Sequence, residues 1–275
     1  MKKISIILTV ALALSLLYAC TTGTANVTPS STSPVINRIL QKGELRVGTA
    51  ASMPPLNMTT KDGKIIGLEA DLARYMADSM GVKLNLKAIQ FSKLLPALKS
   101  GQVDMILSGM TMTSKRNLKV AFAGPYYVSG KGVLTNVATL ASITDPNALD
   151  KRKFKIAALE GSTSADFVTK IMSKATLVTT KDYDDGVNMV IQGKVDAMVA
   201  DHPICIVSVV RYPEHNLFTI IAPFTYEPLG VALPAEDPLL VNWVTNFLNK
   251  LEDSGVMDNV KDRWFKDISW VKKLP

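Results

Sequence analysis

The sequence is poor in cysteine and histidine, with two of each among its 275 residues. Too few of either are present for a disulfide framework or for most metal sites, which draw on clusters of Cys and His. The motifs GxSxG and the phosphate-binding loop are also absent. The net charge of +7 is scattered, with no lysine and arginine run interleaved with aromatics. We therefore expect no metal, no cofactor and no nucleic-acid partner.

Long apolar runs are also missing, apart from one at the N-terminus. Residues 4–17 follow Lys2 and Lys3, and the run closes with LYAC at 17–20, which is typical of an export signal and too short to favour a membrane-spanning helix. LYAC resembles a bacterial lipobox, so residues 1–20 are predicted to be a lipoprotein signal peptide ending at Cys20. An ordinary signal peptide with a chance cysteine is the alternative. Residues 21–35 are rich in Ser, Thr and Pro and are expected to be a flexible tether.

The second cysteine, Cys205, is then left without a disulfide partner in the apolar stretch ICIVSVV. We interpret it as part of the hydrophobic core. His202 is three residues away, but no third group is implied that would orient it, so a nucleophilic site is not expected here.

The rest of the chain is typical of a globular protein, with 47% hydrophobic residues, and is long enough for one large or two modest domains. Hydrophobic periodicity predicts alternating strands and helices in its first part. Strands are expected at 44–50, 82–89 and 103–110, a hairpin at 57–67, and helices at 67–81 and at 91–102, the latter with Pro96 near its start.

The same order of elements then repeats. Strands are expected at 154–161, 176–180 and 195–201, and helices at 162–175, 183–194, 237–254 and 256–265. GQVDMILSG and QGKVDAMVAD end the two series in the same way. This repetition predicts two similarly built α/β lobes, each with a mixed, mostly parallel sheet flanked by helices.

A stretch rich in hydroxyls, SGMTMTSKR at 108–116, follows the last strand of the first series. Asp201 ends the last strand of the second. Because ligands of open α/β sheets bind beyond the carboxyl ends of the strands, both segments are candidates for a ligand site.

Six segments, in this order, carry a resemblance to a known family: LRVGT, GLEADLA, FSKLLPAL, SGMTMTSKR, LEGSTS and GKVDAMVAD. The chain resembles the amino-acid-binding receptors of bacterial ABC importers, solute-binding protein family 3. The resemblance implies a two-lobed periplasmic-binding-protein-like fold, with lobe one at 36–126 and 229–275, lobe two at 131–224, and hinges about 127–131 and 224–228. It also implies an extracytoplasmic, lipid-anchored receptor in the periplasm or at the cell surface. We expect a monomer that closes on a small amino acid and then docks on a membrane permease.

The resemblance also implies roles for individual residues. Arg116, assisted by Thr111, would bind the α-carboxylate of the ligand, and backbone N–H groups around Thr163 would add to it. Asp201, the Gly109 carbonyl and the Thr111 hydroxyl would take the ammonium group. Each residue also has a simpler interpretation, because a solvated arginine, a capping threonine and an aspartate capping the next helix are all common.

The resemblance also implies which positions read the side chain of the ligand, and members of the family that prefer polar or charged amino acids often have Asp, Lys or His there. In this chain all five are apolar: Ala50, Met53, Phe91, Leu159 and Ala200. An unpaired ionic group among them would cost several kcal/mol, so ligands with charged side chains are expected to be disfavoured. The alternative is that Gln90, Asn57 or Glu160 reaches into the site.

Two other functions remain open. Periplasmic cyclohexadienyl dehydratases resemble this family and use a carboxylic acid as general acid. Counting along GSTSADF puts Ala165 at the expected place of that acid, with Asp166 one residue away, so an enzyme is not expected. The other alternative is a receptor for a separate signalling partner.

Overall fold

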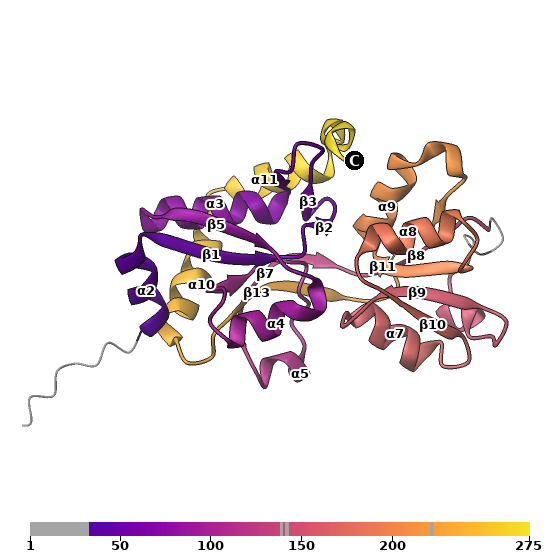
Figure 1. Cartoon of the computed structure of the whole chain (residues 1–275), viewed down its shortest axis with the longest axis horizontal. Coiled ribbons are helices and arrows are strands. Elements are labelled where there is room, and N and C mark those ends of the chain that lie inside the picture. Colours follow the sequence, from indigo (N-terminus) through magenta and orange to yellow (C-terminus); the bar gives the residue numbers. More distant parts are fainter. Residues whose placement is uncertain (1–32, 138–139, 141–142, 221–222) are drawn as a thin grey trace, which may run out of the picture. The chain divides into compact units, whose positions relative to one another are not determined.

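The computed structural model describes residues 33–137, 140, 143–220 and 223–275. The first 32 residues, with the predicted signal peptide and Cys20, lie outside the described part. Two five-stranded sheets and one three-stranded sheet are formed by the described residues. In Figure 1 the first large sheet, on the left, is built from indigo to magenta strands and one golden-orange strand from the later part of the chain, and the second, on the right, from magenta to orange strands.

The first sheet has the order β5-β1-β6-β13-β7, and its strands are far apart in sequence. β1 pairs in parallel with β5 and β6, whereas β13 is antiparallel to both β6 and β7. The strands are β1 (Glu44–Thr49), β5 (Lys83–Ala88), β6 (Met105–Ile106), β7 (Ala121–Ser129) and β13 (Glu227–Leu233).

The second sheet has the order β10-β9-β11-β8-β12. β9 pairs in parallel with β10 and β11, and β8 is antiparallel to β11 and β12. Its strands are β8 (Lys131–Thr135), β9 (Lys155–Leu159), β10 (Thr176–Thr180), β11 (Ala197–Asp201) and β12 (Phe218–Thr219). The predicted mixed sheets are confirmed, but parallel pairings make up half of each sheet and not most of it.

The third sheet contains the predicted hairpin. It consists of β2 (Ser52–Met53), β3 (Asn57–Thr59) and β4 (Ile65–Ile66), which pair antiparallel in chain order.

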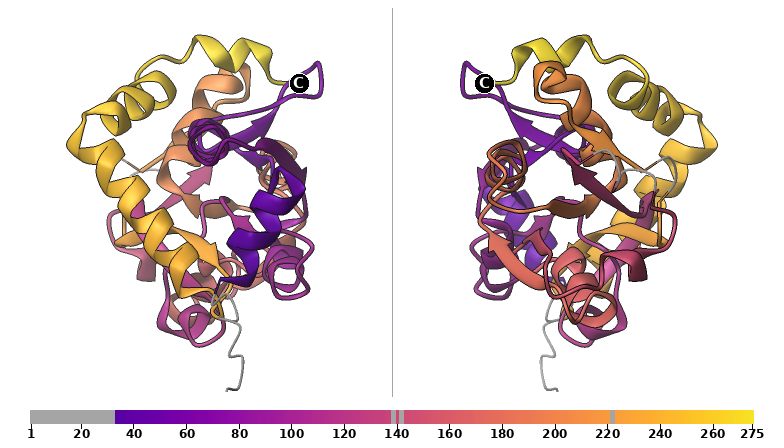
Figure 2. Two further views of the ribbon diagram at one scale, coloured as in Figure 1. Left: turned by 90° about the vertical axis from the view of Figure 1, so that its left-hand side faces the viewer. Right: turned by 90° about the vertical axis from the view of Figure 1, so that its right-hand side faces the viewer.

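Helices cover the sheets as the alternating pattern predicts. Those of the first sheet are α2 (Pro34–Lys42), α3 (Leu68–Met80), α4 (Phe91–Lys99), α5 (Ser114–Asn117), α10 (Pro238–Asp253) and α11 (Val256–Phe265). Figure 2 shows α10 and α11, in yellow, flanking the indigo and purple elements. Those of the second are α7 (Thr163–Ile171), α8 (Tyr183–Ile191) and α9 (His202–Arg211). Short 3₁₀ turns lie at η1 (Pro146–Leu149), η2 (Pro213–His215) and η3 (Ser269–Lys273).

Two local predictions need correction. Pro96 is the sixth of the nine residues of α4 and lies inside this helix, which begins at Phe91 so that Leu94 and Leu98 are buried. The helix α2 begins at Pro34, within the segment expected to be tether, because the buried Asp237 carboxylate accepts hydrogen bonds from the Ser33 hydroxyl and the Val35 N–H.

Three hydrophobic clusters form the core. One lies around the first sheet with α3, α10 and α11, and another lies within the second sheet and α7. The remaining cluster contains residues of both sheets and of their helices. Phe91 and Ile106 come from the first sheet and its helix α4, and Leu159, Tyr183 and Ala200 come from the second sheet and its helix α8. Apolar packing is therefore continuous between the two sheets.

The chain passes from the first sheet to the second at Gly130, between β7 and β8. A Cβ atom on Gly130 would lie 2.2 Å from the carbonyl oxygen of Thr225 on the returning segment. The Lys131 N–H donates to the Thr225 hydroxyl (3.0 Å), and the Phe224 N–H donates to the Lys131 carbonyl (2.8 Å). The outward and returning segments are therefore packed backbone to backbone, which only glycine permits at this position.

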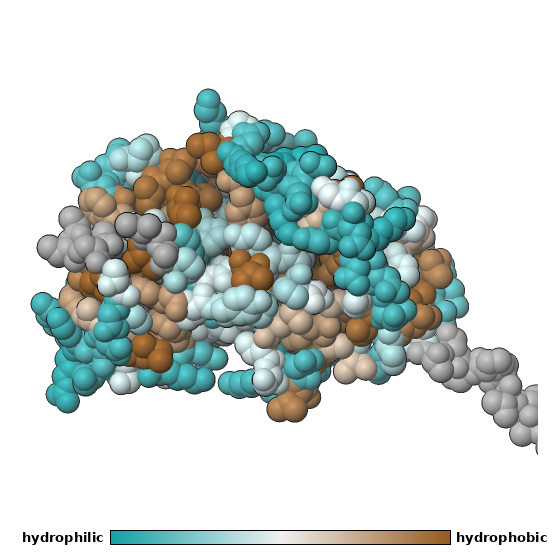
Figure 3. All heavy atoms as spheres, turned by 180° about the vertical axis from the view of Figure 1, so that it is seen from behind, coloured by the Kyte–Doolittle hydropathy of each residue, from teal (hydrophilic) through white to brown (hydrophobic). Residues whose placement is uncertain are grey.

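None of the described helices is long and apolar enough to cross a membrane. On the face shown in Figure 3, hydrophobic residues form separate patches among hydrophilic ones.

Candidate functional site

The loop after β6 is held in place by Glu69, a buried residue of α3. The Glu69 carboxylate accepts hydrogen bonds from the Gly109 N–H (2.6 Å), the Tyr126 hydroxyl and the Asn57 side-chain amide. Gly109 has a φ of +55°, and a Cβ there would lie 2.6 Å from Cε of Met53. The positive φ therefore favours glycine where the SGMT segment turns.

Burial has the largest effect on the pKa values of Glu69 and Tyr126. It raises the pKa of Glu69 above its ordinary value, although the three hydrogen bonds act in the opposite direction. The pKa of Tyr126 is raised well above its ordinary value by burial and by the adjacent Glu69 charge. Tyr126 therefore stays a neutral hydrogen-bond donor to the carboxylate.

Arg116 lies in the short helix α5, which is capped by the Thr113 hydroxyl. Its guanidinium donates to the Thr111 carbonyl (2.9 Å) and, from Nη2, to the Gly161 carbonyl (3.2 Å), which follows β9 of the second sheet. The guanidinium also lies 5.7 Å from the centre of the Phe91 ring. Arg116 is therefore oriented by both sheets and is not a freely solvated side chain.

No carboxylate of the described residues forms an ion pair with Arg116. Burial lowers its pKa, and the more distant charges of Asp166, Asp201 and Glu227 oppose that shift. Arginine nevertheless remains protonated in proteins. The site thus contains a fixed cation that lacks a direct counter-charge, which suits an anionic group of a ligand.

Two threonines connect the two sheets beside this cation. The hydroxyl oxygens of Thr111 and Thr163 are 3.2 Å apart, and the Thr163 hydroxyl donates to Oε2 of Glu227 (3.0 Å). Thr163 is the first residue of α7, whose N-cap Ser162 accepts from the Ala165 N–H. The first N–H groups of α7 have no acceptor within the helix, and they carry its positive dipole end.

Asp201 ends β11 and is almost completely buried, at 2% exposure. Its backbone precedes α9, but its side chain makes no capping hydrogen bond, so the simple capping interpretation is wrong. Instead Oδ1 of Asp201 accepts from Nζ of Lys131, 2.6 Å away. The Lys131 ammonium also lies 3.5 Å from Oε2 of Glu227.

Four of the predicted apolar residues lie in the hydrophobic cluster to which both sheets contribute: Met53, Phe91, Leu159 and Ala200. Ala50 packs against it from the side, and Tyr183 and Met110 are further members. Of the polar alternatives, Asn57 is fully buried against Glu69. Gln90 and Glu160 are hydrogen-bonded to each other (3.2 Å), and Ser92 also donates to Glu160 (3.3 Å).

Sequence reasoning missed Lys131, Glu227 and Glu69. Lys131 is the one charged residue in the apolar stretch GKGVL, and such a residue in a buried strand needs a buried partner. That signal could have identified the lysine. It does not identify Asp201 or Glu227 as its partners.

The Cys205 region does not form a second reactive site. Cys205 is fully buried, and burial raises the pKa of its thiol to about 12. Nε2 of His202 lies 3.0 Å from the Ile220 carbonyl and is thereby occupied. No group of three potential metal ligands occurs among the residues that the structure describes.

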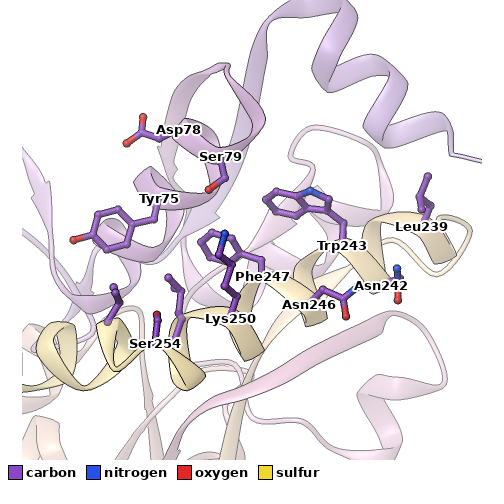
Figure 4. Close-up of a pocket in the computed structure, with 12 residues that line it drawn as sticks. Tyr75, Asp78, Ser79, Leu239, Asn242, Trp243, Asn246, Phe247, Lys250 and Ser254 are labelled. Carbon is purple, nitrogen blue, oxygen red and sulfur yellow. The ribbon is translucent and has the colours of Figure 1, made fainter.

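A groove of about 640 Å³ lies elsewhere, between α3 and α10. Figure 4 shows Trp243 and Phe247 lining it from α10, with Tyr75 and Asp78 opposite on α3. Its charged groups, Asp78 and Lys250, are exposed, so they would hold a charged ligand only weakly. None of the predicted ligand-binding residues lines this groove.

Comparisons with known proteins show relatives with the same fold. A binding component of an ABC transporter from Wolinella succinogenes, solved in complex with lysine, is 34% identical with a TM-score of 0.80, over 84% of this chain and 100% of that one. The L-arginine-binding protein of Pseudomonas aeruginosa is 27% identical over 80% of this chain and 87% of its own length. The cyclohexadienyl dehydratase of the same species is 24% identical over 84% and 86%.

The family model of the bacterial extracellular solute-binding proteins, family 3, matches residues 45–267. The chain belongs to this family.

Proposed function

We propose that the protein is an extracytoplasmic receptor that binds a small α-amino acid without a charged side chain and delivers it to the permease of an ABC importer. The observation that carries this proposal is the Arg116 guanidinium. It is oriented by the Thr111 and Gly161 carbonyls, which lie in the segments that follow β6 and β9, and has no ion-pair partner among the described residues. Such a group is suited to bind a carboxylate with two parallel hydrogen bonds.

The α-carboxylate is assigned to Arg116, with help from the Thr111 hydroxyl and from the first N–H groups of α7 at Thr163. The ammonium group is assigned to Asp201, the Gly109 carbonyl and the Thr111 hydroxyl. The closeness of these residues supports the assignment. The Thr111 and Thr163 hydroxyls are in hydrogen-bond contact, and the charge of Asp201 acts to raise the pKa of Arg116.

The side chain of the ligand is assigned to the apolar residues Ala50, Met53, Phe91, Leu159 and Ala200. Their burial supports a preference for neutral side chains, since a charge among them would lose its hydration without gaining a partner. Several relatives bind cationic amino acids, so this preference would set the present chain apart.

Ligand binding is coupled to hinge closure in this proposal. Lobe one (36–126 and 229–275) and lobe two (131–224) would move about the segments near 127–131 and 224–228. A ligand that contacts both lobes favours the closed form, because only differential contacts shift such an equilibrium. The packing of Gly130 against Thr225 supports a hinge at this place.

Export and anchoring complete the proposal. Residues 1–20 would direct export, and Cys20 would carry the lipid that holds the monomeric receptor at the membrane. A relative from Bacillus subtilis, 26% identical, is a glutamine-binding protein of an ABC transporter, which supports a permease as partner.

Dehydratase activity is the rival within the same fold. Ala165 stands where the resemblance to the dehydratases would place the general acid, and alanine cannot donate a proton. The neighbouring Asp166 is exposed on α7. We therefore propose binding without turnover. Consumption of prephenate or arogenate by the purified protein, followed by absorbance, would contradict this.

The function is tested by thermal unfolding of the protein after it has been unfolded, freed of bound ligand and refolded. The twenty amino acids are added singly. A ligand present at a hundred times its Kd should stabilise the fold by about 2.7 kcal/mol. Small neutral amino acids should give the largest increases in Tm. If lysine, arginine or glutamate gives the largest, the proposed selectivity is wrong, and if no amino acid raises Tm, the proposed ligand class is wrong.

A further inference from the structure

Lys131 and Asp201 are paired by the architecture of the second sheet. They are register partners in the antiparallel pair of β8 and β11, so their side chains share one face of the sheet. Their side chains are 1% and 3% exposed, and Nζ lies 2.6 Å from Oδ1. The contact is therefore fixed by the backbone and is a buried ion pair.

Glu227 belongs to the same cluster of charges. Its Oε2 lies 3.5 Å from the Lys131 ammonium and accepts from the Thr163 hydroxyl, and its Oε1 accepts from the Thr225 hydroxyl (3.1 Å). Through Thr163 and Thr111, Glu227 is linked to the residues assigned to the ligand. One lysine thus faces two buried carboxylates within the proposed ligand site.

This arrangement has a consequence for selectivity. A cationic side chain of a ligand needs a carboxylate in addition to the one that holds its α-ammonium group. Asp201 and Glu227 could provide the two, but the Lys131 ammonium lies against both of them and would repel a second cation at short range. The three groups together keep one net negative charge, which the α-ammonium group of the ligand would balance, so none is left for a cationic side chain.

We propose that Lys131 is the specificity-determining residue of the site: it leaves Asp201 and Glu227 one net negative charge, enough for the α-ammonium group of a ligand but not for a second cation, and so excludes amino acids with cationic side chains. This inference rests on the proposed function. The apolar residues would disfavour any charged side chain. Lys131 is a single charge, and its removal should allow the site to accept cationic side chains.

The test compares three proteins: the wild type, Lys131→Gln, and Lys131→Gln with Glu227→Gln. For each, calorimetric titration gives the Kd of L-lysine, of L-alanine and of L-leucine, which controls for size. Lys131→Gln frees both carboxylates, so the ratio of the Kd of lysine to that of alanine should fall at least tenfold. In the double variant only Asp201 is left, and the ratio should return to within about threefold of the wild-type value.

A ratio in Lys131→Gln that stays within threefold of wild type, in protein with an unchanged circular dichroism spectrum, overturns the inference. A purely structural lysine would alter stability without such a charge-selective change. If Lys131→Gln does not fold, Glu227→Gln provides the opposite test. The cluster then has no net charge and becomes cationic once the α-ammonium group of a ligand is bound, so the Kd of L-glutamate should fall at least threefold relative to that of alanine; no change overturns the inference.

Failure of the proposed function gives a different result. In that case the wild type binds none of the amino acids. If the wild type binds neutral amino acids and Lys131→Gln keeps the same profile, the receptor function stands and only the role of Lys131 is wrong.

Discussion

The N–H of Gly109 donates to Oε1 of Glu69, 2.6 Å away, and this bond ties the helix α3 to the loop that leads to Thr111 and Arg116. GLEADLA and SGMTMTSKR, two of the segments that carry the family resemblance, are thus parts of one structure. The acidic residue of the first segment supports the backbone of the second.

The burial of Glu69 predicts a pH-dependent stability. Its folded-state pKa is raised above the ordinary 4.5, so Glu69 takes up a proton more readily in the folded protein than in the unfolded chain. The resulting stability is fully present below pH 4.5 and is lost as the pH rises through the raised pKa. Glu69→Gln cannot titrate. The unfolding free energy of the wild type minus that of Glu69→Gln should therefore fall by at most about 1.4 kcal/mol per pH unit in that window.

Urea unfolding at pH values from 4 to 8 measures this difference. A difference that does not change with pH would show that Glu69 titrates as it does in the unfolded chain.

Substitution of Gly109 by alanine should damage both stability and binding. The new Cβ would meet Met53 and would force a residue with φ of +55° into a strained conformation. We expect a loss of about 2 kcal/mol or more in unfolding free energy, together with at least tenfold weaker binding of whichever amino acid the panel identifies. Gly43→Ala is the matched control, since its φ is +61° and no atom lies within 4 Å of its Cβ. It should lose about 1 kcal/mol of stability and no affinity.

Asp237 should be among the costly positions for stability. It is fully buried and accepts from the Ser33 hydroxyl (2.7 Å) and from the N–H groups of Val35 (2.8 Å) and Leu240 (2.9 Å). Asp237→Ala leaves donors of two helices unpaired and should cost about 3 kcal/mol.

Asp182→Ala is the comparison, because Asp182 caps α8 with one hydrogen bond to the Asp185 N–H. It should cost about 1 kcal/mol. Equal losses in the two variants, measured by urea unfolding, would contradict the conclusion that Asp237 stabilises the first turns of both α2 and α10.

Cys205 should be unreactive while the protein is folded. Its thiol is fully buried with a pKa of about 12, and the thiolate is the reactive form. Labelling with a maleimide at pH 7, located by mass spectrometry, should modify residue 205 only after denaturant is added. Rapid labelling of residue 205 in native buffer would show that this part of the core opens readily.

Much of the local structure could be predicted from the sequence. The apolar spacing of 68, 72, 76 and 80, closed by Gly81, predicted the helix that is found at Leu68–Met80. Strict alternation predicted β5 in the same way. These signals are local, because periodicity depends only on which face of an element is buried.

The sheets were harder to predict because pairing partners are far apart in the chain. β13 lies between β6 and β7, although more than ninety residues separate it from either, and its antiparallel pairings make half of the first sheet antiparallel. Periodicity alone does not reveal which strands become neighbours.

The partners within the candidate site are hard to predict for the same reason. A lysine and an aspartate that are 70 positions apart become partners only through the pairing of β8 with β11, so the ion pair of Lys131 and Asp201 is not visible in the sequence. Arg116 and Thr111, by contrast, stand in one short motif, and the structure brings them together through the Thr111 carbonyl.

Arg116 carries the central claim, that a guanidinium between the two sheets binds the carboxylate of an amino acid. Charge-assisted hydrogen bonds contribute about 1.5 to 3 kcal/mol each, so loss of a bidentate pair should weaken binding by about a hundredfold or more. Arg152→Ala is the control, because Arg152 is an exposed arginine of the second half of the chain.

The decisive measurement is calorimetric titration of refolded wild type, Arg116→Ala and Arg152→Ala with the amino acid that gives the largest thermal shift. The expected result is tight binding by wild type and Arg152→Ala, and at least a hundredfold higher Kd for a folded Arg116→Ala. An unchanged Kd in Arg116→Ala would contradict the proposed carboxylate site.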